Sequence, residues 1–179
     1  LTELQAAREL FPREQSLIIE ELNIYLENKD YERAENNLKL AAEGDPTNEI
    51  LWFSLGSVYD NLGKTELAAE AYLKALEINA AYFDANYNLG AMYFNEAVQG
   101  INAANDMWKP RMSKDEATKQ RDLEEGGKAM FSTALPYLET ALEVEPNDRE
   151  TLRSLRDIYA RVGMDEKMLE VSAKLKTLE

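Results

Sequence analysis

Apolar and small residues recur along this chain of 179 residues at helical spacing, and their pattern returns every 34 residues, in places degraded. The clearest copy runs over residues 49–82. Its marked positions are Trp52, Leu55, Gly56 and Tyr59, then Ala68, Tyr72 and Ala75. Spacings of three and four residues place side chains on one face of a helix, so each copy predicts two amphipathic helices joined by a turn. A period of this length is typical of helix-turn-helix arrays whose units cannot each bury their own apolar face.

The same register returns before this copy, over residues 15–48. The matching positions are Ile18, Tyr25, Ala34, Leu38, Ala41 and Pro46. Glu21 and Leu22 stand where the clearest copy has a Leu-Gly pair, so the packing of this helix departs from the pattern. Residues 1–14 are in phase with a second helix through Leu4, Ala7, Leu10 and Pro12. We expect this segment to be either the trailing helix of a preceding repeat, in a chain cut from a longer array, or an N-terminal cap.

Two further copies follow the clearest one. Leu89, Gly90 and Tyr93 open a third unit, which we place at residues 83–148. The second helix of this unit returns only at Ala134, Leu138, Ala141 and Pro146, displaced by 32 residues through an insertion at about 97–128. The fourth unit, residues 149–179, keeps Leu152, Leu155, Tyr159 and Gly163 and then decays, with Arg156, Met168 and Ser172 in the other slots. Such decay is typical of a C-terminal capping unit.

This pattern is similar to that of the tetratricopeptide repeat (TPR), W-x2-L-G-x2-Y followed by Ala, an aromatic residue, Ala and Pro. Ala80 stands where the family has proline. The resemblance implies an all-α, right-handed solenoid of paired helices that binds proteins. The long third unit, the A-L-P-Y-L-E stretch at 134–139 and the degenerate last unit resemble bacterial TPR proteins. Several of those are exported, which tilts the localisation slightly and leaves the compartment open.

Composition narrows the function. The chain has no cysteine and no histidine, which removes thiol nucleophiles, Ser-His triads and the usual zinc, copper and haem ligands. An enzyme built from carboxylates alone stays conceivable; we expect a non-catalytic protein without a cofactor. The formal net charge of −14 disfavours nucleic acid and favours a basic or apolar protein or peptide partner. No apolar run approaches the roughly 18–20 residues of a transmembrane helix.

The resemblance also implies where a ligand binds, because the first helix of each TPR unit lines the concave face. We expect a peptide groove formed by Ile19, Asn23, Phe53, Ser54, Ser57, Tyr87, Asn88, Phe94 and Asn95, with Glu20, Ile50, Asn61 and Asp84 on neighbouring slots. The alternative is that the aromatic members pack against neighbouring helices. One TPR subtype grips the carboxylate tail of chaperones with Lys and Arg. This chain has Ile19, Asp84 and Asn88 in three of those slots, which disfavours that ligand.

The insertion predicts that both helices of the third unit are prolonged into a protruding antiparallel hairpin. Ala97, Ile101, Ala104 and Trp108 continue the first face, and Leu123, Gly127, Met130 and Ala134 carry the second. Lys109-Pro110-Arg111 breaks the helix, and Ser113 with Glu116 forms a capping box that starts the next one. We expect Gly100, Gly126 and Gly127 to permit close helix contact. Pro136 should kink the second helix without ending it.

The predicted tip of this hairpin differs from the acidic body. Residues 109–121 contain five basic side chains against two acidic ones. Trp108, Lys109, Arg111 and Lys114 are the expected contact residues. A basic, aromatic tip suits an acidic partner, lipid headgroups or the groove of a second copy. The alternative is a solvated turn with Trp108 folded back over the hairpin.

Together these patterns predict a protein-interaction scaffold that binds a peptide or protein segment in its concave groove. Two alternatives stay open. One is a self-assembling structural scaffold, because open solenoid ends expose apolar surface. The other is an accessory array of a larger enzyme or envelope protein.

Overall fold

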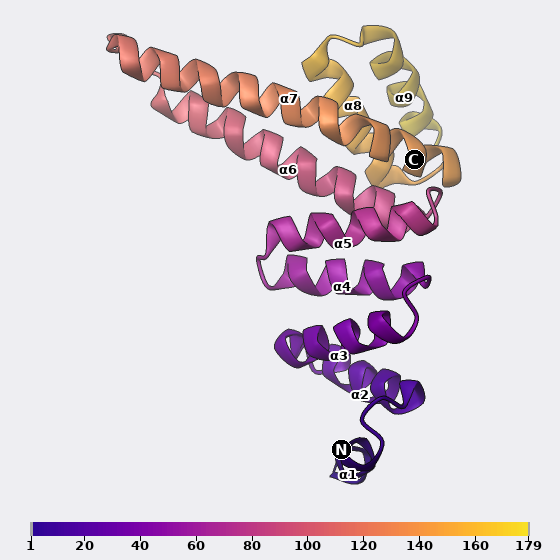
Figure 1. The fold of residues 1–179 in the computed structure, drawn as a ribbon. Coiled ribbons are helices and arrows are strands. Elements are labelled where there is room, and N and C mark those ends of the chain that lie inside the picture. The colour runs from indigo at the N-terminus through magenta and orange to yellow at the C-terminus, as the bar shows by residue number, and fades with distance from the viewer. Residues whose placement is uncertain (1, 179) are drawn as a thin grey trace. The chain divides into compact units, whose positions relative to one another are not determined.

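The computed structural model describes residues 2–178, and every regular element in that range is an α-helix (Figure 1). The helices are α1 (Thr2–Leu10), α2 (Gln15–Glu27), α3 (Tyr31–Gly44), α4 (Glu49–Asn61), α5 (Thr65–Ile78), α6 (Phe83–Met107), α7 (Lys114–Val144), α8 (Arg149–Val162) and α9 (Asp165–Thr177). The chain forms two compact units that divide between Ala85 and Asn86. The all-helical TPR-type fold predicted from the sequence is confirmed.

In the first unit, helices that follow one another in the chain pack against each other from α1 to α5. The small residues of the repeat lie at these contacts. Ala34, Leu38 and Ala41 of α3, and Ala68, Tyr72 and Ala75 of α5, expose at most 1% of their surface. Alanine at these positions lets the backbones approach, and the larger residue between them fills the remaining space. The 34-residue register therefore marks the buried face of each second helix.

Gly56 shows why the repeat has a glycine in its first helix. A Cβ atom at this position would lie 2.6 Å from two ring atoms of Tyr72, closer than van der Waals contact allows. The ring of Tyr72 occupies the space that a side chain at Gly56 would need. The same relation occurs in the second unit, where a Cβ atom at Gly90 would lie 2.6 Å from Leu138.

Glu21 replaces the leucine of the repeat in α2, and the structure accounts for this departure. Its side chain is buried and accepts hydrogen bonds from Tyr25 Oη at 2.7 Å and Asn37 Nδ2 at 2.9 Å. It also forms an ion pair with Arg8 Nε at 3.2 Å. Burial alone would raise the pKa of Glu21, but the hydrogen bonds from Asn37, Tyr25 and Arg8 outweigh it, and the pKa lies below its usual value. A polar network thus joins α1, α2 and α3.

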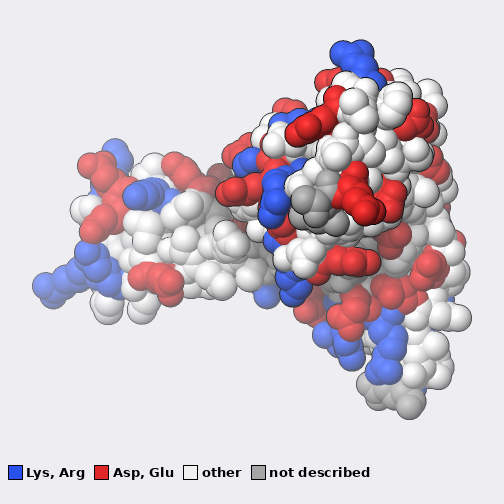
Figure 2. Space-filling model, turned by 90° about the horizontal axis from the view of Figure 1, so that it is seen from below, with Lys and Arg blue, Asp and Glu red and all other residues white. Residues whose placement is uncertain are grey.

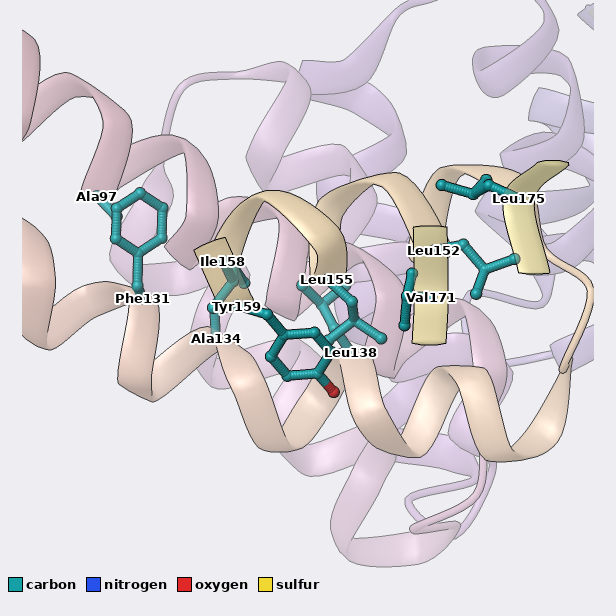
Figure 3. Close-up of a cluster of buried hydrophobic side chains, with 10 residues drawn as sticks. All are labelled: Ala97, Phe131, Ala134, Leu138, Leu152, Leu155, Ile158, Tyr159, Val171 and Leu175. Atoms are coloured by element: carbon teal, nitrogen blue, oxygen red, sulfur yellow. The ribbon is translucent and has the colours of Figure 1, made fainter. Parts of the chain in front are cut away.

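The second unit is built around a long hairpin. α6 and α7 contain 25 and 31 residues, whereas no other helix exceeds 14. Figure 1 shows them side by side, running in opposite directions to a free end. A buried apolar cluster joins α6, the end of α7 nearest α8, α8 and α9 (Figure 3). Its members are Ala97, Phe131, Ala134, Leu138, Leu152, Leu155, Ile158, Tyr159, Val171 and Leu175.

Two of the three hairpin glycines lie at the helix contact. A Cβ atom at Gly127 would lie 2.9 Å from the carbonyl oxygen of Ala97, and one at Gly100 would lie 3.4 Å from the Cα atom of Gly127. Gly126 faces open space, because no described atom beyond its chain neighbours and the adjoining backbone of α7 lies within 4 Å of its ideal Cβ position. The prediction that Gly126 permits close contact is therefore wrong. Adjacent residues on a helix point about 100° apart, so only one of the pair faces the partner helix.

The predicted breaks and caps of the hairpin are present. α6 ends at Met107, before Pro110. Ser113 caps α7 by accepting from the backbone N–H of Glu116 at 3.3 Å, and the Glu116 carboxylate accepts from the Ser113 N–H at 2.9 Å. α7 then continues through Pro136, as predicted.

Candidate binding surfaces

The solvent side of α2 is a narrow polar stripe. Ser16, Glu20, Asn23 and Glu27 are exposed at spacings of four, three and four residues, and we call this stripe the open face of α2. The opposite side is buried through Ile18, Glu21, Leu22 and Tyr25. Of the two groove residues predicted here, Asn23 lies in the stripe and Ile19 is half-buried at its edge.

The solvent side of α4 is more apolar. Its residues are Ile50, Phe53, Ser54, Ser57 and Asn61, which we call the open face of α4. Ile50 is 58% exposed, and Asn61 donates to the carbonyl oxygen of Ser57 at 2.8 Å. The ring of Phe53 is half-buried, with its centroid 5.8 Å from that of Tyr72 and 5.3 Å from that of Tyr82. Phe53 thus packs on neighbouring rings and still presents part of its surface to solvent.

The remaining groove candidates lie on α6, in the second unit. Tyr87 and Asn88 are half-buried, and Asn95 is exposed. Burial raises the pKa of Tyr87, with a further contribution from the carboxylates of Glu150 and Asp148. Phe94 is half-buried against α7, with its ring centroid 5.5 Å from that of Phe131, so one side of this ring serves the packing of the hairpin.

α2, α4 and α6 contain no basic side chain, a property that the sequence pattern alone did not reveal. Together they span 51 residues and contain eight carboxylates but no Lys or Arg. An even spread of the chain's 20 basic residues would place about six there. The other helices all carry Lys or Arg, and α8 alone has four Arg. The signal was present in the sequence, but only the helix boundaries sort the charges in this way.

The basic side chains of the first unit are held elsewhere. Lys39 of α3 and Lys64 of the α4–α5 turn both pair with Glu35, at 2.6 and 2.5 Å. Both hydrogen bonds lower the pKa of Glu35, although its burial opposes them. Lys74 of α5 lies over the ring of Trp52 at 4.2 Å from its centroid. These contacts tie cations to the second helices and the turns of the unit.

Three carboxylates of α2 and α4 have no such partner. The side chains of Glu20, Glu27 and Asp60 are exposed, and none forms an ion pair or hydrogen bond with another residue in the range 2–178. The open faces of α2 and α4 therefore combine free negative charge with the apolar surface of Ile50 and Phe53. Such a surface suits a ligand with cationic and apolar groups.

The hairpin tip forms a separate candidate surface. Trp108 is 65% exposed, so it does not fold back over the hairpin. Lys109 Nζ contacts Glu116 Oε1 at 2.7 Å. Hydrogen bonds from Lys109 and Ser113 lower the pKa of Glu116 to about 2. In Figure 2 basic and acidic side chains are mixed on the visible face, and basic ones reach the outer end of the arm.

Residues 2–178 contain neither a cluster of metal-binding side chains nor a helix that could span a membrane. Among these residues, no three Asp or Glu side chains are grouped so as to hold a metal ion. In the same range, no helix is both long enough and apolar enough to span a bilayer.

The tetratricopeptide repeat profile matches residues 50–82. Solved structures extend the likeness over the chain: that of MamA superposes with a TM-score of 0.67 at 15% identity, over 98% of this chain and 84% of that chain. The chain thus contains a tetratricopeptide repeat and has the fold of TPR proteins. The human IFIT1 dimer with m7Gppp-AAAA gives a TM-score of 0.62 at 19% identity, over 98% of this chain and 36% of that chain. At these identities the likeness concerns the fold.

Two other comparisons concern proteins whose names or titles state what they bind. The first TPR of Spaghetti (RPAP3) bound to the HSP90 peptide SRMEEVD gives a TM-score of 0.55 at 23% identity, over 83% of this chain and 93% of that chain. The peroxisomal targeting signal receptor of Candida albicans is 32% identical over 72 residues, 40% of this chain. The matched part spans 12% of that receptor and 13% of the one from Kluyveromyces lactis.

Proposed function

We propose that this TPR protein is a non-catalytic scaffold whose open faces of α2 and α4 bind a peptide or protein segment with basic and apolar side chains. The observation that carries the proposal is the absence of Lys and Arg from α2 and α4, beside exposed carboxylates and the exposed Ile50. TPR proteins in general are modules of protein interaction, and RPAP3 and the peroxisomal receptors are named for peptide or signal recognition.

The distribution of charge on α2 and α4 favours a positively charged ligand. A cationic side chain gains from the unpaired carboxylates of Glu20 and Glu27 without displacing an existing ion pair. An acidic tail, such as the one bound by RPAP3, would find no cation on α2, α4 or α6. We therefore propose a ligand opposite in charge to that peptide.

The apolar side chains of the open face of α4 offer surface that a ligand can bury, which adds to the attraction between charges. Ile50 and the free side of Phe53 offer surface that an aliphatic or aromatic ligand side chain covers. Asn23 is exposed, and its amide can both donate to and accept from a ligand backbone. Two acidic positions on α2 and two apolar positions on α4 favour a ligand segment with both kinds of side chain.

The experiment is calorimetric titration of the whole chain with a labelled nonapeptide that alternates Lys or Arg with Leu and Ala. A second nonapeptide, used for comparison, has Glu at every position where the first has Lys or Arg. We expect binding of the basic peptide alone, weakened at least tenfold by Glu20→Lys with Glu27→Lys. The control is Glu70→Lys with Glu77→Lys, which makes the same charge change at the same spacing on exposed positions of α5. Equal loss in both variants, or equal affinity for both peptides, would contradict the proposal.

A further inference from the structure

The tip of the α6–α7 hairpin, residues 107–114, carries the basic side chains that the open faces of α2 and α4 lack. It contains Lys109, Arg111 and Lys114 and no carboxylate. Arg111 and Lys114 are exposed, and neither forms an ion pair with any residue from 2 to 178. The exposed ring of Trp108 lies beside them in the sequence. The tip is thus a basic and aromatic segment within an acidic chain.

The tip is also held in one conformation at both of its ends. The backbone N–H of Trp108 donates to the carbonyl oxygen of Asn105 at 3.0 Å. The capping box of Ser113 and Glu116 fixes the start of α7, and Lys109 is tied to Glu116. Because these contacts already order the loop, docking it onto another surface immobilises little additional chain.

The length of the arm separates the tip from the rest of its unit. Phe131, where the buried cluster begins in α7, lies 17 positions after Lys114, a distance of about 25 Å at helical rise. The Debye length at physiological salt is about 8 Å, so the charges around the cluster are largely screened at the tip. The cations Arg111 and Lys114 are therefore screened from the charges around the cluster, and the acidic residues near them are Asp106, Asp115 and Glu116, of which Glu116 is paired with Lys109.

We propose that the hairpin tip of one copy of this chain docks onto the open faces of α2 and α4 of a second copy. The inference rests on the proposed function and names one partner for it. Residues 1–85 contain seven basic against 17 acidic residues, a net charge of −10. Trp108 covers Ile50 and Phe53, and the cations of the tip approach the free carboxylates of the open faces.

A second copy fits the tip better than an anionic lipid surface does. Lipid headgroups would attract the three cations, but a bilayer repels the strongly acidic remainder of the chain. The second copy offers negative charge together with the exposed side chain of Ile50. Each copy has one tip and one receiving surface, so two copies can dock reciprocally as a dimer or pass the contact on to further copies.

The test is sedimentation velocity of the whole chain over a concentration series, at about 50 mM and about 500 mM salt, because only the higher salt screens the contact strongly. The tip variant is Arg111→Glu with Lys114→Glu. Lys114 is the first residue of α7, where glutamate favours the helix. The receiving variant is Glu20→Lys with Glu27→Lys. The controls are Arg149→Glu with Lys176→Glu, and Glu70→Lys with Glu77→Lys, all on exposed positions.

We expect the sedimentation coefficient to rise with concentration at low salt and to stay at the monomer value at high salt. The tip and receiving variants should remain monomeric, while both controls associate like the unchanged chain. A chain carrying all four tip and receiving substitutions reverses both charges, so it should associate again. Association that survives either variant, or a charge-reversed chain that stays monomeric, would overturn the proposal.

Other outcomes separate this inference from the proposed function. If the unchanged chain is monomeric at every concentration but binds the basic nonapeptide, the docking of a second copy is wrong and the proposed function stands. If it neither associates nor binds the peptide, both are wrong. If the monomer binds phosphatidylglycerol vesicles and Arg111→Glu with Lys114→Glu abolishes that binding, the tip contacts lipid, and the docking of a second copy is overturned.

Discussion

At the scale of single residues, the buried carboxylate of Glu21 is the point where this chain departs most from the repeat pattern. Removing it with Glu21→Ala leaves the buried side chain of Asn37 without its acceptor and Arg8 without its partner. We expect a loss of about 3 kcal/mol in the free energy of unfolding at pH 7, measured by urea denaturation. Glu20→Ala, at the exposed neighbouring position, should change it by less than about 0.5 kcal/mol. Equal effects would mean that the network contributes nothing.

The same carboxylate gives the first unit a defined response to acid. The folded-state pKa of Glu21 lies below its usual value of 4.5, so its ionisation stabilises the fold above that pH, and this contribution is lost as the pH falls further. Glu21→Gln removes the titrating group. The unfolding free energies of the unchanged chain and this variant should differ at pH 7 and converge as the pH falls through the lowered folded-state pKa of Glu21. A gap of constant size from pH 7 to pH 3 would show that the charge of Glu21 is not involved.

At the scale of elements, the two adjacent glycines of α7 report on the closeness of the hairpin. Gly127→Ala forces a methyl group against the backbone of Ala97, and we expect a loss of about 1–3 kcal/mol in stability. Gly126→Ala meets open space and removes a poor helix former, so it should stabilise by up to about 1 kcal/mol. Thermal or urea unfolding of the two variants decides this. Changes of the same sign would mean that α6 and α7 do not approach at this point.

The tip of the hairpin makes its own prediction. The hydrogen bond from Lys109 is the largest cause of the low pKa of Glu116, followed by those from Ser113. Carboxyl NMR shifts of Glu116 should therefore titrate near pH 2, and Lys109→Ala should move the midpoint toward 4.5. An ordinary midpoint in the unchanged chain would show that the loop between α6 and α7 is open in solution.

Sequence register predicted the elements better than it predicted individual contacts. Alanines such as Ala34 and Ala68 were placed correctly, because a small residue at fixed phase is required wherever two helices touch. The partners of Glu21 could not be predicted, since Arg8 and Asn37 lie 13 and 16 residues away and periodicity does not say which polar groups meet. The prediction for Gly126 was wrong because the neighbouring residue, Gly127, is the one that faces α6.

Several sequence interpretations stay predictions. These are the repeat boundaries at 48/49, 82/83 and 148/149, the groove residues on α6, and export from a bacterial cell. For the groove, the sequence did not distinguish residues that contact a ligand from residues that pack against neighbouring helices. Phe53 and Phe94 illustrate the reason, because each ring is half-buried against other aromatic rings.

At the scale of the whole molecule, charge is sorted by element. The first helices of the first three predicted units lack Lys and Arg, while the second helices and the hairpin tip carry them. Solubility alone requires no such sorting, since it depends on net charge and on the absence of large apolar patches. A binding surface of one sign does require it.

The most direct test of this account is an NMR titration of the ¹⁵N-labelled chain with the basic nonapeptide. The largest shift changes should fall on backbone amides of residues 15–27 and 49–61, and on those of α3 and α5 only where they pack against these helices. Changes centred on the outer sides of α3 and α5, or a uniform response of all acidic segments, would contradict the claim that the cation-free helices form the binding surface.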